Sequence, residues 1–212
     1  MTSNQGYKLS ELAKLKIHFI GIGGAGMSGI ARIMLAKGFS ISGSDKNDSS
    51  LLTSLKALGA VIFIGHDAQN LGQAELVIVS SAIAEGNPEL AAAKAKNIPV
   101  VQRANALAWL MAESTSIAVA GTHGKTTTTA MLTVALQSAG LDPSFAIGAT
   151  VSNSGTNAHQ GSGNTFIVEA DESDGSFLAY KPSGAIITNI ELDHVDHFAN
   201  EDEVFAVFEQ FV

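Results

Sequence analysis

The residues best suited to chemistry form a glycine-rich run, Gly121-Thr122-His123-Gly124-Lys125-Thr126, between an apolar segment and a helical pattern. Backbone N–H groups in such a turn can bind phosphates, the Lys125 ammonium can reach the outer phosphates, and the Thr126 hydroxyl can bind magnesium. The common phosphate loop, G-x-x-x-x-G-K-[ST], requires glycine where this chain has Val119, so the run is a compact variant. It predicts a nucleotide-phosphate site that serves phosphoryl transfer; a lysine and a threonine that only cap a helix are the alternative. The residues expected at this site are Gly121, Thr122, His123, Gly124, Lys125, Thr126 and Thr127.

A second glycine turn, Gly21-Ile22-Gly23-Gly24-Ala25-Gly26, lies earlier in the chain and contains G-x-G-x-x-G. It follows a strand pattern and opens a helix, whose N-terminus offers N–H donors to a pyrophosphate. Asp45, at the end of the next strand, can accept a hydrogen bond from a ribose or another ligand hydroxyl. His66 follows a third strand and is a further candidate at this edge. The pattern predicts binding of NAD or a UDP-sugar, and a turn needed only for packing is the alternative.

Acidic residues follow a later strand pattern, in Glu169-Ala170-Asp171-Glu172-Ser173-Asp174. Carboxylates gathered at the C-terminal end of a parallel strand repel one another, and a divalent cation would relieve that repulsion. The same edge is where α/β sheets bind ligands. The run therefore indicates a site for a divalent metal ion, with a solvated acidic loop as the alternative.

A mixed acidic and histidine run, 191–197, follows another strand pattern. Asp and His side chains at a strand end can supply oxygen and nitrogen ligands to a metal. Magnesium prefers oxygen, so a histidine ligand would make the site tolerant of manganese. We expect His194 to contact metal or phosphate, and His197 to lie at the surface.

The elements that must position these residues alternate between short apolar strands and helical patterns. Strands are predicted at 17–20, 39–43, 61–64, 76–80, 98–101, 117–120, 166–169 and 185–189. Helices are predicted at 26–37, 49–58, 88–96, 105–113, 125–139 and 201–212, with a short one possible at 9–15. This alternation predicts an α/β fold with parallel sheets covered by helices. The pattern restarts at Ser116, which places a domain boundary near 112–116.

Composition narrows the class of protein. The 212 residues are 46% hydrophobic and 15% charged, which is globular and not disordered. A formal net charge of -8 argues against nucleic acid as a partner. The absence of cysteine excludes disulfides, thiolate catalysis and Cys-ligated zinc. Apolar runs of about five to seven residues are far below the ~20 that span a bilayer, and no signal peptide is evident, so we expect a soluble cytoplasmic protein.

Taken together, the motifs resemble the Mur ligases, a family that acts in bacterial cell-wall synthesis. The stretches that carry the resemblance cover most of residues 17–198: HFIGIGGAGMSGIA, SGSD, VSSAI, GTHGKTTT, EADESDGSF and TNIELDHVD. GTHGKTTT is typical of the wider family, which includes folylpolyglutamate synthetases, and GIGGAGMSGIA points to its alanine-adding members. The resemblance implies an ATP-dependent ligase that phosphorylates the carboxylate of UDP-N-acetylmuramate, after which the amine of L-alanine attacks the acyl phosphate.

The resemblance also implies roles for individual residues. Lys125 would contact the ATP phosphates, and Thr126 with Glu169 would bind one magnesium ion. His194 would bind a second, which makes Lys125, Glu169 and His194 the catalytic set. The residues expected at the UDP-sugar site are Gly21, Gly23, Gly24, Ala25, Gly26, Met27, Asp45, His66 and Ser80. Residues 1–113 would form a Rossmann-like UDP-sugar-binding domain, and 114–212 part of a P-loop-type ATP-binding domain.

The chain departs from the family in length, because its members run to more than twice 212 residues. The third domain, which completes the amino-acid and adenine sites, is expected to lie outside this sequence. Arg32 and Arg103 both fall in the first domain, away from where a carboxylate of L-alanine would bind. We therefore expect no ligation by these residues alone. Alternative functions are a ligase that adds a recycled peptide to UDP-N-acetylmuramate, an NAD-dependent oxidoreductase and a non-catalytic nucleotide-binding module.

Overall fold

A computed structural model describes residues 7–151, 155–172, 175–193, 198 and 200–212 of the chain. The chain divides into two compact units, Met1–Trp109 and Leu110–Val212, each of which contains one sheet. The division falls inside α5 (Arg103–Met111), close to the range 112–116 in which the sequence pattern places a boundary.

The first unit contains a five-stranded sheet in the order β3-β2-β1-β4-β5, which confirms the predicted Rossmann-like parallel sheet. Its strands are β1 (Lys16–Ile20), β2 (Ser40–Asp45), β3 (Val61–Ile64), β4 (Leu76–Val79) and β5 (Val100–Gln102). Every neighbouring pair is parallel. The strand order reverses between β1 and β4, and ligands of open α/β sheets bind beyond the carboxyl ends of the strands at such a point.

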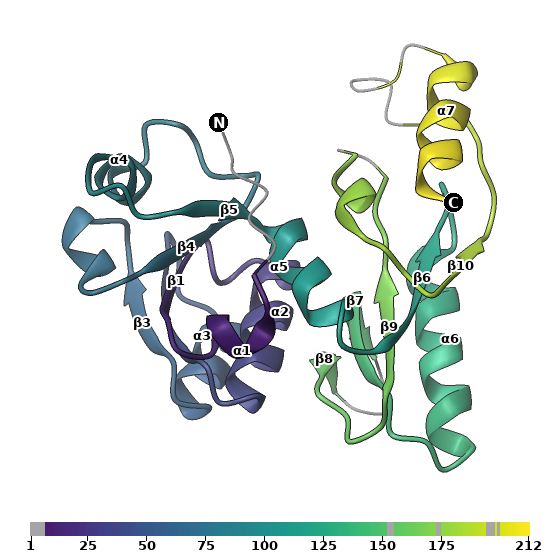
Figure 1. Cartoon of the computed structure of the whole chain (residues 1–212), viewed down its shortest axis with the longest axis horizontal. Helices are drawn as coiled ribbons and strands as arrows, with labels where there is room; N and C mark the ends of the chain where they lie inside the picture. The colour runs from purple at the N-terminus through teal and green to yellow at the C-terminus, as the bar shows by residue number, and fades with distance from the viewer. Residues whose placement is uncertain (1–6, 152–154, 173–174, 194–197, 199) are drawn as a thin grey trace. The chain divides into compact units, whose positions relative to one another are not determined.

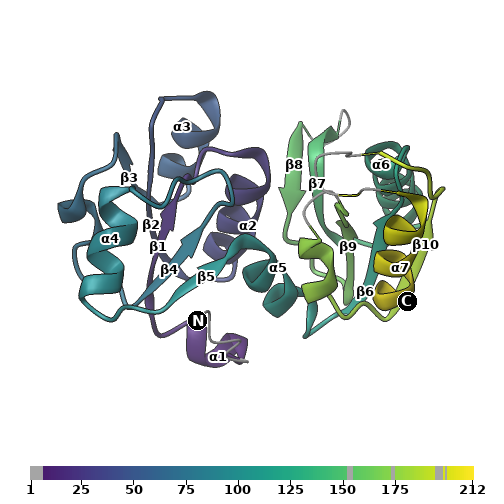
Figure 2. The ribbon, with the colours of Figure 1, turned by 90° about the horizontal axis from the view of Figure 1, so that it is seen from above.

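Helices cover both faces of this sheet. On one face lie α2 (Ala25–Ala36) and α3 (Ser50–Ala57), and on the other lies α4 (Pro88–Ala95) (Figure 1 and Figure 2). The sequence offers a cap where two of them begin: the side chains of Ser49 and Asn87 accept N–H groups of the first turns of α3 and α4. The unit also contains α1 (Leu9–Leu12) and the 3-10 helix η1 (Ala68–Leu71).

The second unit contains a mixed sheet in the order β10-β6-β9-β7-β8. Its strands are β6 (Thr115–Ala120), β7 (Ser144–Val151), β8 (Thr156–His159), β9 (Thr165–Glu169) and β10 (Gly184–Ile187). All neighbours are parallel except β7 and β8, which are antiparallel. The sequence pattern does not predict β7 or β8. The second half of β7 is largely exposed and its register with β8 shifts after Ala146, so neither strand has the buried apolar pattern that marks β6 and β9.

Among the residues that the structure describes, three helices complete the second unit. They are α6 (Lys125–Ser138), the 3-10 helix η2 (Ser176–Ala179) and α7 (Glu201–Phe211). Apolar residues of α6 pack on a core that includes Phe145 and Ile167, and Phe177 of η2 stacks on Phe211 of α7 at 4.6 Å. None of the helices among the described residues is both long enough and apolar enough to cross a bilayer.

The threonines of α6 illustrate why a helix tolerates β-branched residues here. Thr129 is fully buried and its hydroxyl donates to the Lys125 carbonyl at 2.7 Å. Thr133 is also fully buried and donates to the Thr129 carbonyl at 2.8 Å. Because the helix itself accepts these hydroxyl protons, the two threonines pack and do not face a ligand.

Candidate functional site

The first glycine turn is closed by hydrogen bonds of its own. The N–H groups of Gly21 and Ile22 both donate to the Ser44 carbonyl, at 2.9 and 3.0 Å. The Gly24 N–H donates to the Gly21 carbonyl at 3.3 Å, and the Gly23 N–H donates to Asp45 Oδ2 at 2.9 Å. These N–H groups therefore stabilise the conformation of the turn and its attachment to β2. The N-terminal end of α2 begins beside the turn, and its partial positive charge favours an anion there.

Gly23 is required by a close approach to Asp45. A Cβ atom at Gly23 would lie 2.8 Å from Asp45 Oδ2, closer than such atoms ever come. From the sequence, Gly23 is expected at the UDP-sugar site and the Asp45 carboxylate is expected to accept from a ligand hydroxyl. In the structure, the Asp45 carboxylate itself occupies the space beside Gly23 and fixes the turn to the end of β2.

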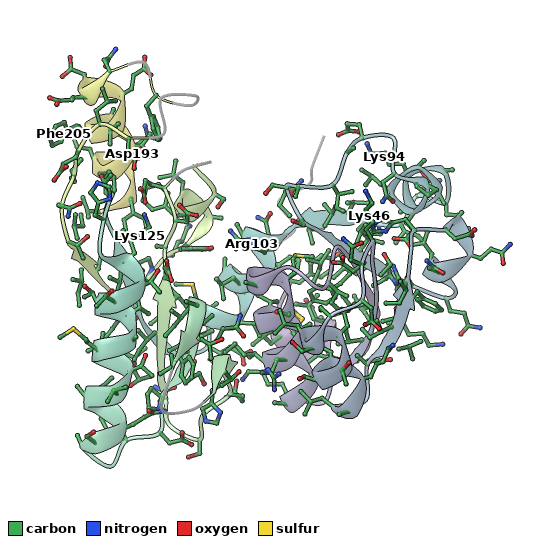
Figure 3. All side chains as sticks on the ribbon, turned by 180° about the vertical axis from the view of Figure 1, so that it is seen from behind. Lys46, Lys94, Arg103, Lys125, Asp193 and Phe205 are labelled. Carbon is green, nitrogen blue, oxygen red and sulfur yellow. The ribbon has the colours of Figure 1, made fainter. Side chains whose placement is uncertain are left out.

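Several of the predicted residues meet at one open pocket of about 700 Å³ at the carboxyl edge of the first sheet. Those that line it are Gly21, Gly24, Asp45, His66 and Ser80, together with Lys46, Ala82, Ile83, Ala84, Gly86 and Asn87. Of the other residues predicted here, Ala25 begins α2 and Gly26 lies against Arg103. The Met27 side chain is buried, so only its backbone can reach a ligand. Figure 3 shows the exposed Lys46 at this edge of the sheet.

A buried carboxylate lies beneath the pocket. Glu89, the second residue of α4, is fully buried and contacts His66 Nδ1 at 3.2 Å. Its Oε1 accepts from Asn70 Nδ2 at 2.6 Å, and the Ser44 hydroxyl donates to Oε2, the oxygen that faces His66. Burial by itself would raise the pKa of Glu89, but the facing His18 ring and these donors outweigh burial and lower it to about 2. Glu89 is therefore an ionised group that can only accept hydrogen bonds.

In the second glycine turn, the lysine folds back over the loop. Lys125 Nζ donates to the carbonyls of Gly121 and Thr122 at 2.8 and 3.1 Å. It also forms an ion pair with Glu172 at 2.9 Å, and the side chains of the two are 12% and 2% exposed. Figure 3 shows Lys125 at the N-terminal end of α6. The ammonium thus lies where the sequence predicts phosphates to bind, with each of its three protons directed at an oxygen.

The rest of this turn is tied to the segment after β10. The N–H groups of Thr122 and His123 donate to Asn189, at 3.0 and 2.9 Å. A Cβ atom at Gly121 would meet the Thr188 hydroxyl, so this position also needs glycine. The donors of Thr122 and His123 are therefore used within the protein. The N–H groups at the start of α6, from the N-cap Gly124 to Thr127, are placed to bind phosphates.

Two of the predicted metal ligands lie side by side. The Thr126 hydroxyl donates to Glu169 Oε1 at 2.7 Å, and the Gly148 N–H donates to Glu169 Oε2 at 2.6 Å. A hydroxyl and a carboxylate oxygen suit magnesium, which commonly takes one or two protein ligands and completes its shell with phosphate and water. The described residues contain no group of three or more His, Asp or Glu side chains that could hold a metal alone. His194 lies outside the described residues.

Several residues that contact the predicted site residues could not be identified from sequence motifs. Glu89, Ser44 and Asn70 carry no motif, and Glu89 in Asn87-Pro88-Glu89 reads as an ordinary acid in the first turn of a helix. Lys46 follows Asp45 and could have been noted as a cation beside the first turn. Glu172 lies in the predicted acidic run, but its pairing with Lys125 depends on the tertiary fold.

Comparison with known proteins gives matches along most of the chain. Residues 16–115 match the model described as the Mur ligase family catalytic domain, and residues 119–212 match the Mur ligase middle domain. The UDP-N-acetylmuramate–L-alanine ligase of Renibacterium salmoninarum is 56% identical over 205 residues, which are 97% of this chain and 44% of that protein. That of Mycolicibacterium smegmatis is 54% identical over 202 residues, 93% of this chain and 42% of that protein. The chain thus spans less than half the length of these relatives.

Solved structures give the same family. The UDP-N-acetylmuramate:L-alanyl-γ-D-glutamyl-meso-diaminopimelate ligase from Neisseria meningitides has a TM-score of 0.84 at 33% identity, covering 93% of this chain and 67% of that one. The UDP-N-acetylmuramate–alanine ligase from Thermotoga maritima has a TM-score of 0.83, also at 33% identity, covering 93% of this chain and 46% of that one.

Proposed function

Since this chain belongs to the Mur ligase family, we propose that it carries the UDP-sugar and ATP sites of an ATP-dependent ligase that joins L-alanine to UDP-N-acetylmuramate. Residues 1–113 form the UDP-sugar-binding domain in this proposal, and residues 114–212 form part of the ATP-binding domain. The observation that carries the proposal is the cluster at the second glycine turn, in which Lys125 lies over the loop and Thr126 contacts Glu169 at 2.7 Å. Identity of 56% to an alanine-adding relative supports the choice of amino acid.

At the ATP site, the proposed work of the protein is positioning and charge neutralisation. Lys125 exchanges the carbonyls of the turn for phosphate oxygens, and the first N–H groups of α6 hold the same phosphates. Thr126 and Glu169 are the residues that would hold magnesium, which when bound supplies positive charge to the transferring phosphoryl group. Transfer of that group to the sugar's carboxylate gives the acyl phosphate, and attack by the amine of L-alanine then releases phosphate.

At the first site, the pocket beside the first glycine turn holds the UDP-sugar. The first turn of α2 and the Lys46 ammonium offer positive charge to its diphosphate, and Ser80 and His66 offer polar contacts to the remainder. The structure from Neisseria meningitides supports one alternative, a ligase that adds a peptide in place of L-alanine, but it is 33% identical where the alanine-adding relative is 56% identical.

Thermal melting of the 212-residue chain tests the proposal with one ligand at a time. UDP-N-acetylmuramate should raise the melting temperature by several degrees, since ligand binding to the native state adds RT ln(1 + [L]/Kd) to stability. ATP with magnesium should give a smaller rise, and NADH none. A rise with NADH and none with the UDP-sugar would favour the oxidoreductase alternative and contradict the proposal.

A further inference from the structure

We infer that Glu89 is a positioning residue for His66, which it holds with the ring proton on Nδ1 so that Nε2 accepts a hydrogen bond from a hydroxyl or imide N–H of the bound ligand. The inference rests on the proposed function, because it assigns one polar contact within the proposed UDP-sugar pocket. It also specifies which part of the UDP-sugar His66 recognises.

The first step is the rigidity of the Glu89 carboxylate. Oε1 accepts the Asn70 amide at 2.6 Å and the Asp67 N–H at 3.3 Å. The backbone N–H of Glu89 donates to the Asn87 side chain at 2.9 Å, at the start of α4. The buried His18 ring lies on a further side, with Nε2 3.7 Å from Oε2. A carboxylate fixed in this way cannot turn to follow a mobile partner, so its partner must adjust to it.

The protons around Glu89 Oε2 decide which nitrogen of the His66 ring is protonated. The Ser44 hydroxyl donates its single proton to Glu89 Oε2. His66 Nδ1 then lies 3.0 Å from an oxygen of Ser44 that can only accept and 3.2 Å from an ionised carboxylate. An unprotonated Nδ1 would set three acceptors against one available proton, whereas an N–H at Nδ1 satisfies both oxygens. The environment therefore selects the form of the ring with its proton on Nδ1.

The third step concerns the other ring nitrogen. The His66 side chain is 18% exposed and lines the pocket, while Nδ1 faces the buried carboxylate. Nε2 is thus the nitrogen left for the pocket, and in a neutral ring protonated at Nδ1 it is an acceptor. A UDP-sugar offers donors at its ribose and sugar hydroxyls and at the uracil imide, but its phosphates only accept. His66 therefore belongs beside the nucleoside or the sugar, and Lys46 and α2 remain for the diphosphate.

Long-range ¹H–¹⁵N NMR of the histidine rings tests the inference in the 212-residue chain, at about pH 8 where an ordinary histidine is mostly neutral. The His66 signals are identified by their loss in His66→Asn. We expect a protonated Nδ1 and an unprotonated Nε2, and UDP-N-acetylmuramate should shift the Nε2 signal without protonating it. A proton on Nε2, in either state, would overturn the inference. If the ligand moved no signal at all, the proposed function would fail, and the position of the ring proton would still have been decided.

Two variants separate positioning from simple structural support. Glu89→Gln should move the proton of the His66 ring partly to Nε2. It should also lower the affinity for UDP-N-acetylmuramate about tenfold, the loss expected for one hydrogen bond. The control is Asn70→Ala, which removes a donor from the opposite carboxylate oxygen and should lower the melting temperature without moving the ring proton. If both variants lowered the melting temperature and neither moved the proton, Glu89 would be structural only. Should Glu89→Gln fail to fold, the wild-type spectrum still decides the question.

Discussion

The two glycine turns have the same strand–turn–helix form, but side chains of opposite charge lie against them. Each joins a parallel strand to a helix, and in each several N–H groups of the loop donate to acceptors within the protein. In the first, the Asp45 carboxylate from the neighbouring strand holds the turn. In the second, the Lys125 ammonium from the following helix lies over it. A glycine motif therefore specifies a backbone path, and the side chain that fills the turn specifies its chemistry.

The origin of that side chain also differs. Asp45 ends β2, is paired with Ile64 of β3 and accepts the Gly23 N–H, so it ties the first turn to the sheet. Lys125 has a long side chain on the first residue of α6, and its contacts with the loop can be exchanged for phosphate oxygens. In our proposal the first turn is a preformed wall of a pocket, and the second is a site whose own cation moves onto the ligand.

The largest effect is expected from Lys125→Ala. In an enzyme that combines this chain with the remainder of a Mur ligase, turnover should fall by ~10³-fold or more, since charge stabilisation of a transferring phosphoryl group is usually a large effect. The structure also predicts a loss of stability, because the variant removes the ammonium that pairs with the buried Glu172 carboxylate and should cost about 3 kcal/mol of unfolding free energy.

The double variant Lys125→Ala with Glu172→Gln separates these two effects. It should recover most of the stability in urea unfolding and none of the turnover in a phosphate-release assay. Recovery of turnover would show that Lys125 acts only as the partner of Glu172, and the contrast between the two turns would then be structural alone.

A smaller effect is expected when the first turn is overfilled. Gly23→Ala places a methyl group 2.8 Å from Asp45 Oδ2 and should cost about 1–3 kcal/mol of unfolding free energy. It should also reduce the melting shift with UDP-N-acetylmuramate. Gly184→Ala is the matched control, because a Cβ atom there meets nothing within 4 Å. Adding Asp45→Ala should restore part of the loss if the carboxylate is what crowds Gly23; strict additivity of the two changes would argue against it.

The buried Glu89 carboxylate under the first pocket should make the unfolding free energy depend on pH in acid. The folded pKa of Glu89 is about 2 against an ordinary 4.5, so its stabilising effect is complete above about pH 4.5 and is lost as the pH falls towards 2. The difference in unfolding free energy between wild type and Glu89→Gln should shrink across this range, by at most about 3 kcal/mol. Urea unfolding at a series of pH values measures it, and a difference that does not change with pH would mean that Glu89 is not ionised in the folded state.

The smallest effect is expected from Lys46→Ala at the rim of the first pocket. An exposed ammonium near a diphosphate should contribute a few-fold in affinity for UDP-N-acetylmuramate, and salt should remove that contribution. Lys94→Ala, which breaks an exposed pair with Glu85, is the control and should leave affinity unchanged. Equal effects of the two variants on titration would exclude a specific role for Lys46.

The sequence predicts most of the strands of the two sheets and the helices that follow them. The parallel strands and the helices after both glycine turns follow from apolar runs and from glycine placement. The strands β7 and β8 do not, because their exposed positions and shifted register leave no periodic pattern. At the sites, motif residues such as Lys125 and Thr126 are found from spacing. Glu89 and its partners are not, since 45 residues separate Ser44 from Glu89 and only the fold brings them together.

The pairing order of the strands also sets when each turn can form during synthesis of the chain. The first sheet is complete once residue 102 has been made, and the partners of the first glycine turn, Ser44 and Asp45, are made soon after it. The second turn needs Asn189 and Glu191, which follow it by 66 and 69 residues. Its strand β6 lies between β9 and β10, which are also made late. During synthesis, the first unit can therefore fold before the residues that hold the loop around Lys125 have been made.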